Sequence, residues 1–176
     1  MFLALDSYYK DNVCNTSLVV FKLEDDKIIY SDTIYTKVTF DYVPGEFYKR
    51  ELPGIKKILK KFIKEQLELW DKIHAVIVDG YITLKVGDKE WGGLGDHLHN
   101  YLIKYGHSKI VYGVAKNNFG DCDKISSKVF RGKSKKPLYV QTTAAPIVAP
   151  WHVFKMHGKY RIPTALKEVD KLSRIF

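Results

Sequence analysis

The segment Ala75–Gly80 constrains the fold more than any other stretch of the chain. Four apolar residues lead directly into Asp79, and Gly80 follows. A short apolar run with β-branched residues is typical of a strand that is buried on both faces of an α/β sheet. A carboxylate at the carboxyl end of such a strand lies where open α/β sheets bind ligands. The alternative is that Asp79 and Gly80 only form a turn after the strand.

The rest of the chain predicts three consecutive strands and then alternating helices and strands. The expected strands span residues 2–6, 18–23, 28–40, 75–78, 110–114 and 137–141; the expected helices span 53–71 and 94–105, with a third from 163. Turns are expected at Asp11–Asn12 and Asn15, and Pro146 and Pro150 should interrupt the chain before the last helix. An antiparallel meander followed by a strand–helix–strand unit predicts one α/β domain over residues 1–176, a mixed sheet flanked by helices.

Charge is the most informative feature of the composition. The formal net charge of the 176 residues is +9. This excess favours an acidic partner, nucleic acid before an anionic membrane surface, although many basic domains are merely soluble. Five lysines lie opposite the apolar face of the first expected helix, and they are more typical of a solvated surface than of a binding site. They are Lys56, Lys57, Lys60, Lys61 and Lys64.

The cysteines and the chain start bear on the compartment. Cys14 and Cys122 lie far apart and have no metal-ligand spacing, so we expect free thiols in a reducing compartment. No segment has the pattern of a membrane span or of a signal peptide. We therefore expect a cytoplasmic protein that is a monomer and does not bind a membrane.

Three carboxylates are expected to converge. Asp6 ends the first expected strand, Asp79 ends the fourth, and Glu51 precedes the first helix. If the two strands are parallel neighbours, their carboxylates meet and repel one another unless a cation lies between them. Oxygen ligands suit Mg²⁺ or Mn²⁺, which in a nucleic-acid binder indicates phosphodiester hydrolysis. The alternative is three unrelated surface acids.

The order of these acids resembles that of ribonuclease H-like nucleases, and short motifs are spread over most of the chain. They are Tyr42–Gly45 (Tyr-Val-Pro-Gly), Tyr48–Glu51 (Tyr-Lys-Arg-Glu), Val78–Gly80 (Val-Asp-Gly), Leu94–Gly95 with His99, Gly113–Lys116 (Gly-Val-Ala-Lys), Pro137–Val140 (Pro-Leu-Tyr-Val) and Gly158–Pro163 (Gly-Lys-Tyr-Arg-Ile-Pro). In this order the motifs resemble those of the endonuclease V family, whose members are metal-dependent nucleases that recognise inosine.

This resemblance implies a role for each matched residue. Asp6 and Asp79 would be the main ligands of Mg²⁺, or of Mn²⁺, and Glu51 would hold the metal directly or through water. Lys116 would lie near the scissile phosphate. The loop residues Tyr42, Pro44 and Gly45 would contact the substrate, with Tyr42 as a wedge that stacks on bases. Gly80 and Gly113 would let backbone groups approach the flipped base.

The sequence departs from the family in three places. Thr142–Ala145 stands where the family carries Thr-Gly-His, so an active-site histidine is missing there; His152 could replace it but is more typical of a structural residue. We also expect the family's N-terminal helical extension to be missing, while Asp41 stands in place of a proline and the segment before Pro163 is shortened.

We therefore expect a ribonuclease H-like, Mg²⁺-dependent endonuclease that acts near inosine in DNA or RNA. Two alternatives stay open. One is a protein that binds inosine-containing strands and cleaves them weakly or not at all, and the other is a structure-selective nuclease that ignores inosine.

Overall fold

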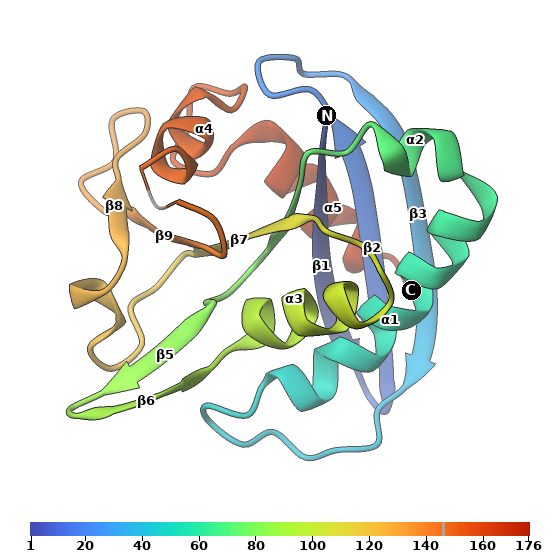
Figure 1. Ribbon diagram of the computed structural model, residues 1–176, viewed down its shortest axis with the longest axis horizontal. Helices are drawn as coiled ribbons and strands as arrows, with labels where there is room; N and C mark the ends of the chain where they lie inside the picture. Colours follow the sequence, from blue (N-terminus) through green and yellow to red (C-terminus); the bar gives the residue numbers. More distant parts are fainter. Residues whose placement is uncertain (146) are drawn as a thin grey trace.

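A seven-stranded mixed sheet forms the centre of the computed structural model, which describes residues 1–145 and 147–176 (Figure 1). The strand order is β3-β2-β1-β4-β7-β9-β8, and β5 and β6 form a separate hairpin. The strands are β1 (Phe2–Lys10), β2 (Val13–Phe21), β3 (Ile28–Lys37), β4 (Ala75–Val78), β5 (Thr83–Val86), β6 (Lys89–Gly92), β7 (Ile110–Ala115), β8 (Ser127–Val129) and β9 (Leu138–Thr142). The helices are α1 (Tyr48–Glu65), α2 (Leu67–Asp71), α3 (Leu94–Lys104), α4 (Ala149–Lys155) and α5 (Thr164–Ser173), with a 3₁₀ turn η1 (Cys122–Lys124).

Strand pairing confirms the expected mixed sheet. β1, β2 and β3 form an antiparallel meander. β4 runs parallel to β1 and to β7, with Leu5 opposite Val78 and Val78 opposite Gly113. β4 is therefore a central strand flanked by two parallel neighbours, and this explains why its four residues are all apolar and buried.

Helices cover both faces of the sheet, and the alternation of side chains along β1 decides which residues face which layer. Leu3 and Leu5 pack with residues of α1, α2 and α3 in one core. Phe2 and Ala4, which point the opposite way, pack with residues of α4 and α5 in a second core. Figure 1 shows α1 and α3 on one side of the sheet and α5 on the other.

Several expected boundaries were wrong. β1 and β2 continue as a long hairpin that turns only at Asp11 and Asn12, so Asn15 lies within β2 rather than in a turn. Asn15 is fully buried, and its amide donates hydrogen bonds to the carbonyl groups of Leu172 and Ile175 at 3.3 and 2.8 Å. Burial of this side chain is tolerated because the end of the last helix supplies acceptors.

The first helix begins a turn earlier than expected and is shorter. α1 starts at Tyr48, so Pro53 lies inside it rather than at its start. The expected helix over 53–71 is divided after Glu65, and α2 follows. β8 and α4 were not expected. Pro150 is in the first turn of α4, where a missing N–H costs nothing, whereas Pro146 lies outside the described residues.

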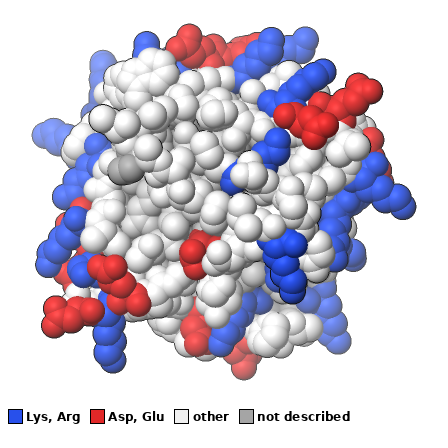
Figure 2. Space-filling model, viewed as in Figure 1, with Lys and Arg blue, Asp and Glu red and all other residues white. Residues whose placement is uncertain are grey.

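Basic side chains lie around most of the rim of the face in Figure 2, including the side occupied by α1, while the region over α4 is largely free of charge. Among the helices that the structure describes, none is both long enough and apolar enough to cross a bilayer.

Candidate metal and nucleic-acid site

An acidic cavity of about 220 Å³ opens where the parallel strands β1 and β4 stop pairing. It contains all four residues that the sequence suggested for catalysis, together with two charged residues from α5 and its C-terminal end. Its lining residues are Asp6, Ser7, Phe47, Glu51, Asp79, Lys116, Asp170 and Arg174.

The fold explains why the three predicted carboxylates converge. Asp6 and Asp79 each follow the last parallel pair, Leu5 and Val78. The sequence predicted Asp6 at the end of the first strand. β1 continues to Lys10, so Asp6 lies within the strand instead. Glu51 comes from the first turn of α1, and Gly54 in the next turn allows the helix to approach β2. A Cβ atom at Gly54 would lie 2.2 Å from Thr16 Oγ1.

Crowding of the carboxylates raises two pKa values. Burial raises the pKa of Asp6 to about 6, the charge of Asp79 acts in the same direction, and a 2.7 Å hydrogen bond from Ser173 opposes both. Burial, followed by the charges of Asp6 and Asp79, raises the pKa of Glu51 well above its usual range. Glu51 is only 6% exposed, which is why burial is the largest cause of this shift.

Lys116 supplies the positive charge of the cavity. Its Nζ lies 2.7 Å from an oxygen of Asp79 and 3.6 Å from one of Asp170. Burial disfavours its charged form, but Asp79, Asp6 and Asp170 outweigh burial, so the pKa of Lys116 is raised. Lys116 follows β7, which pairs with β4, and this brings it beside Asp79.

Asp170 and Arg174 are charged residues of the cavity that the sequence analysis did not identify. Asp170 comes from α5, and the Arg174 guanidinium contacts both of its oxygens at 2.9 Å. These hydrogen bonds, with help from Lys116, lower the pKa of Asp170. The available signal was weak: Asp170 adjoins the buried Val169 in a helix in which charged residues are common.

The segment Thr142–Ala145, where the family histidine was expected and is absent, follows the end of β9 that lies away from Lys116. β9 runs antiparallel to β7, with Tyr139 opposite Ala115 and Thr142 opposite Tyr112. The chain therefore moves away from Lys116 as it approaches Thr142. His152 is also remote: it hydrogen-bonds the Tyr112 hydroxyl at 2.9 Å and packs on Phe2, at the start of β1.

A second, aromatic cavity of about 390 Å³ adjoins the acidic one and shares Phe47, Asp79 and Lys116 with it. Of the predicted substrate contacts, Tyr42, Gly45 and Gly80 line this cavity. Its other walls are aromatic side chains and the loop that follows β7. They include Tyr48, Tyr81, Leu84, Leu94, Asn117, Asn118 and Phe119.

Pro44 and Gly113 do not line the aromatic cavity. Pro44 lies exposed in the loop before α1. Gly113 lies beneath the backbone of residues 80–82. A Cβ atom at this position would be 2.6 Å from the Gly80 carbonyl oxygen and 3.0 Å from the Ile82 nitrogen. Gly113 thus lets the chain after Asp79 cross β7 closely, rather than contacting a ligand itself.

Two interactions fix the loop that carries Tyr42. Trp91 on β6 donates a hydrogen bond from its indole N–H to the Gly45 carbonyl at 3.0 Å. Gly45 has φ +82°, a conformation suited to glycine, and its Cα faces the Trp91 ring. The Tyr42 side chain remains 60% exposed and meets the Phe47 ring edge-on, at 6.0 Å between centroids.

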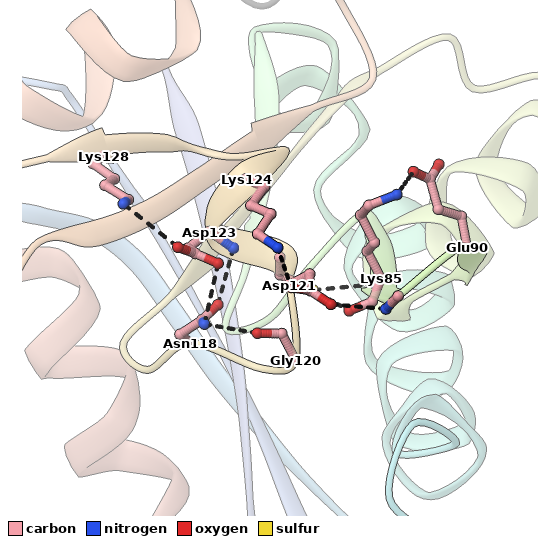
Figure 3. Close-up of polar contacts among 10 residues, drawn as sticks. Lys85, Glu90, Asn118, Gly120, Asp121, Asp123, Lys124 and Lys128 are labelled. Atoms are coloured by element: carbon pink, nitrogen blue, oxygen red, sulfur yellow. Dashed lines mark hydrogen bonds and ion pairs between the residues drawn. The ribbon is translucent and has the colours of Figure 1, made fainter.

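The β5–β6 hairpin is in turn held by the loop before η1, as Figure 3 shows. The Asp121 carboxylate accepts a hydrogen bond from the Gly87 backbone N–H at 2.7 Å, and the Asp121 N–H donates to the Lys85 carbonyl at 2.9 Å. Asn118 closes the same loop through Gly120 and Asp123. One polar network therefore connects the wall of the aromatic cavity at Asn118 to the hairpin that bears Trp91.

The chemistry of the acidic cavity fits a hard divalent cation. Its acidic groups offer only oxygen ligands, and Glu51 is a buried carboxylate that forms no ion pair with any of the described residues. Within the described residues, no group of three or more His, Cys, Asp or Glu side chains is arranged to hold a metal ion. The donor types are thus suitable, while Lys116 is the cation that contacts Asp79.

Comparison with known proteins agrees with this architecture. Residues 3–83 match the sequence model of the family described as endonuclease V. No curated protein matches the sequence. Among solved structures, the chain is similar to the catalytic domain of human endonuclease V, with 20% identity, a TM-score of 0.76, and coverage of 98% of this chain and 80% of that one.

Two further structures extend the likeness. Endonuclease V of Ciona intestinalis, solved in complex with DNA that contains an inosine, is 19% identical with a TM-score of 0.78, over 98% of this chain and 84% of that one. Endonuclease V from Streptomyces avermitilis is 23% identical with a TM-score of 0.67, over 98% and 79%. The sequence match to the endonuclease V model is confined to residues 3–83, whereas the fold shared with these solved structures extends over 98% of the chain.

Proposed function

We propose that the protein is a divalent-metal-dependent endonuclease that recognises inosine in a nucleic-acid strand. One observation carries this proposal: a cavity large enough for a base and a cavity lined by carboxylates share Asp79 and Lys116. A base held in the aromatic cavity therefore has its own backbone phosphates beside the acidic groups. The Ciona structure with inosine-containing DNA supports inosine as the base.

The aromatic cavity supplies recognition. Its aromatic walls can stack on an extruded base, and the exposed Tyr42 can fill the gap that this base leaves in the strand. Backbone groups at Gly80 border the cavity, and with φ +149° this residue occupies a conformation that side chains disfavour. A larger residue at position 80 would strain the chain at the point where it leaves Asp79.

The acidic cavity supplies the chemistry. Asp6, Asp79 and Glu51 would hold Mg²⁺ or Mn²⁺, which when bound activates a water and neutralises charge on the scissile phosphate. Asp170 holds Lys116 and Arg174 in the cavity. Lys116 would transfer part of its contact from Asp79 to the phosphate, because both are anionic oxygens within its reach.

The direct experiment compares cleavage of matched strands with inosine or adenosine, in DNA and in RNA, with Mg²⁺, Mn²⁺ or EDTA. We expect cleavage near inosine that requires metal, and a loss of about 10²- to 10³-fold in Asp79→Asn, the order of loss seen when a main electrostatic contribution is removed. Retained cleavage in EDTA would contradict metal dependence. Equal cleavage of the adenosine strand would instead identify a structure-selective nuclease.

A second candidate function is inosine binding without cleavage. It is favoured by the 2.7 Å pair between Lys116 and Asp79, which occupies a ligand oxygen with a protein cation. Tight binding of the inosine strand with no product in any metal would support it. We also propose that the protein is a monomer, and that it is cytoplasmic, a location consistent with the buried free thiols of Cys14 and Cys122.

A further inference from the structure

A third concave surface, the α1–α3 groove, lies apart from the two cavities and has a volume of about 330 Å³. It combines lysines with aromatic rings and contains no acidic residue. Its lining residues are Leu52, Lys56, Lys60, His97, Asn100, Tyr101, Lys104 and Tyr105.

The walls of the groove are two straight rows of side chains. On α1, Leu52, Lys56 and Lys60 follow Tyr48 at intervals of four residues, so all four share one face of the helix. On α3, His97, Tyr101 and Tyr105 form the facing row with the same spacing. The α1 row extends over about 18 Å, given a helical rise of ~1.5 Å per residue.

The groove begins at the aromatic cavity. Tyr48 lines that cavity and stacks on His97, with ring centroids 3.6 Å apart and an interplanar angle of 18°. His97 lines the groove. The two hollows are thus separated by a single stacked pair of rings, whereas no residue of the groove lines the acidic cavity.

The positive charges of the groove lysines lie beside aromatic rings, where an anionic ligand can contact them. Lys56 lies 5.1 Å from the ring centre of Tyr101, and Lys60 and Lys104 lie 5.7 and 6.0 Å from that of Tyr105. None of these three lysines forms an ion pair with any residue that the structure describes. Lys61 on the same helix differs, because it contacts Asp32 at 2.7 Å. Figure 2 shows basic side chains on the side of this face where α1 and α3 lie.

We propose that the α1–α3 groove binds the flank of a single-stranded nucleic acid that lies on the opposite side of the recognised base from the scissile phosphate. This assignment rests on the proposed function. The acidic cavity receives the backbone on one side of the base. The strand on the other side of the base therefore leaves the aromatic cavity past Tyr48 and His97. Lysines bind the phosphates, and the half-exposed Tyr105 stacks on a base. The row accommodates roughly five stacked nucleotides at ~3.4 Å each.

The test compares two double variants that remove the same charge from α1. Lys56→Ala/Lys60→Ala removes two of the three lysines that line the groove. Lys57→Ala/Lys64→Ala removes two exposed lysines that do not line it. Fluorescence anisotropy with a labelled inosine-free single strand reports binding, and thermal melting reports folding. We expect the groove variant alone to lose roughly 10- to 30-fold in affinity at 0.1 M salt and to reduce the salt slope by ~1.4.

Strand truncation assigns the flank. With wild-type protein, shortening an inosine strand on the side away from the cut should weaken binding, and the groove variant should be indifferent to that shortening. Tyr105→Ala should lose at least about 5-fold, and Tyr105→Phe should retain affinity because the ring can still stack. Equal losses in both lysine variants, or an equal loss with duplex and single strand, would overturn the assignment.

The experiments distinguish a failure of the endonuclease proposal from a failure of the groove assignment. If no strand is cleaved in any metal but the groove variant still loses affinity for the inosine-free strand, the endonuclease assignment is wrong and the groove is a strand-binding surface. If cleavage is normal and the two lysine variants bind alike, only the groove is wrong.

Discussion

Asp79 differs from the other two predicted metal ligands in having its own cation. Lys116 contacts it at 2.7 Å, whereas burial and mutual repulsion raise the pKa values of Asp6 and Glu51. The free-energy cost of ionising the carboxyl groups of the cavity is therefore largest at Asp6 and Glu51. A divalent cation would relieve both, and this makes their titration a sensitive indicator of the electrostatics of the site.

The first prediction concerns Asp6 and the stability of the metal-free protein. Its folded-state pKa is about 6, above the ordinary value of 3.8, so the folded protein binds this proton more tightly. The carboxylate consequently destabilises the fold as pH rises from about 4 to 6, and the loss persists above that range. Asp6→Asn should raise the free energy of unfolding at pH 7.5 by about 1–3 kcal/mol.

Thermal melting in EDTA at pH 7.5 and pH 4 measures this effect. The gain in melting temperature should be several degrees at pH 7.5 and should nearly vanish at pH 4. Asp26→Asn, an identical change in an exposed loop, is the control and should shift neither melting temperature. A gain from Asp6→Asn that is equal at both pH values would contradict the titration argument.

The second prediction concerns Asp170, which positions Lys116 and Arg174. Asp170→Asn removes the charge that both cations contact, so Lys116 should remain on Asp79 and Arg174 should lose its anchor. We expect cleavage to fall by about 10- to 100-fold with little change in strand affinity, because the aromatic cavity does not include Asp170. Single-turnover cleavage and anisotropy measure the two quantities, and Glu168→Gln on the same helix is the control.

At the scale of elements, the sequence revealed the centre of the sheet and missed its edges. The apolar pattern of Ala75–Val78 and the acid that follows it are local signals, so β4 and the carboxylate pair could be predicted. The direction of β9 is set by pairing with β7 and has no local signal. That is why Thr142–Ala145 was expected at the site and Asp170, which depends on the docking of α5, was not.

The third prediction concerns the hairpin that holds the loop before α1. Trp91→Phe keeps a ring beside Gly45 but removes the hydrogen bond to its carbonyl. We expect faster amide exchange in residues 40–46 and a loss of discrimination between inosine and adenosine strands, since Tyr42 would be less firmly placed. Trp151→Phe, the same change on the exposed face of α4, is the control. Unchanged exchange in the loop would show that the hydrogen bond is dispensable.

At the scale of the whole molecule, an excess of nine positive charges surrounds a local cluster of acids. The surface lysines attract a phosphate backbone, and the acids can accept that backbone only if a cation neutralises them. Strand binding and metal binding should therefore reinforce each other. A protein that only bound strands would gain nothing from keeping Asp6, Glu51 and Asp79 together, because their charge opposes the ligand.

The last prediction follows from this coupling. The proposed function requires Mg²⁺ to bind the folded protein where the carboxylates converge, so at pH 7.5 Mg²⁺ should raise the melting temperature in proportion to ln(1 + [Mg²⁺]/Kd). The rise should be absent in Asp79→Asn and intact in Asp26→Asn. A saturating titration with an inosine strand present should give a lower Kd for Mg²⁺ than one without it. If the wild-type melting temperature does not change at any concentration of Mg²⁺ or Mn²⁺ while strand binding is retained, the protein is a strand-binding protein in which Lys116 has replaced the metal.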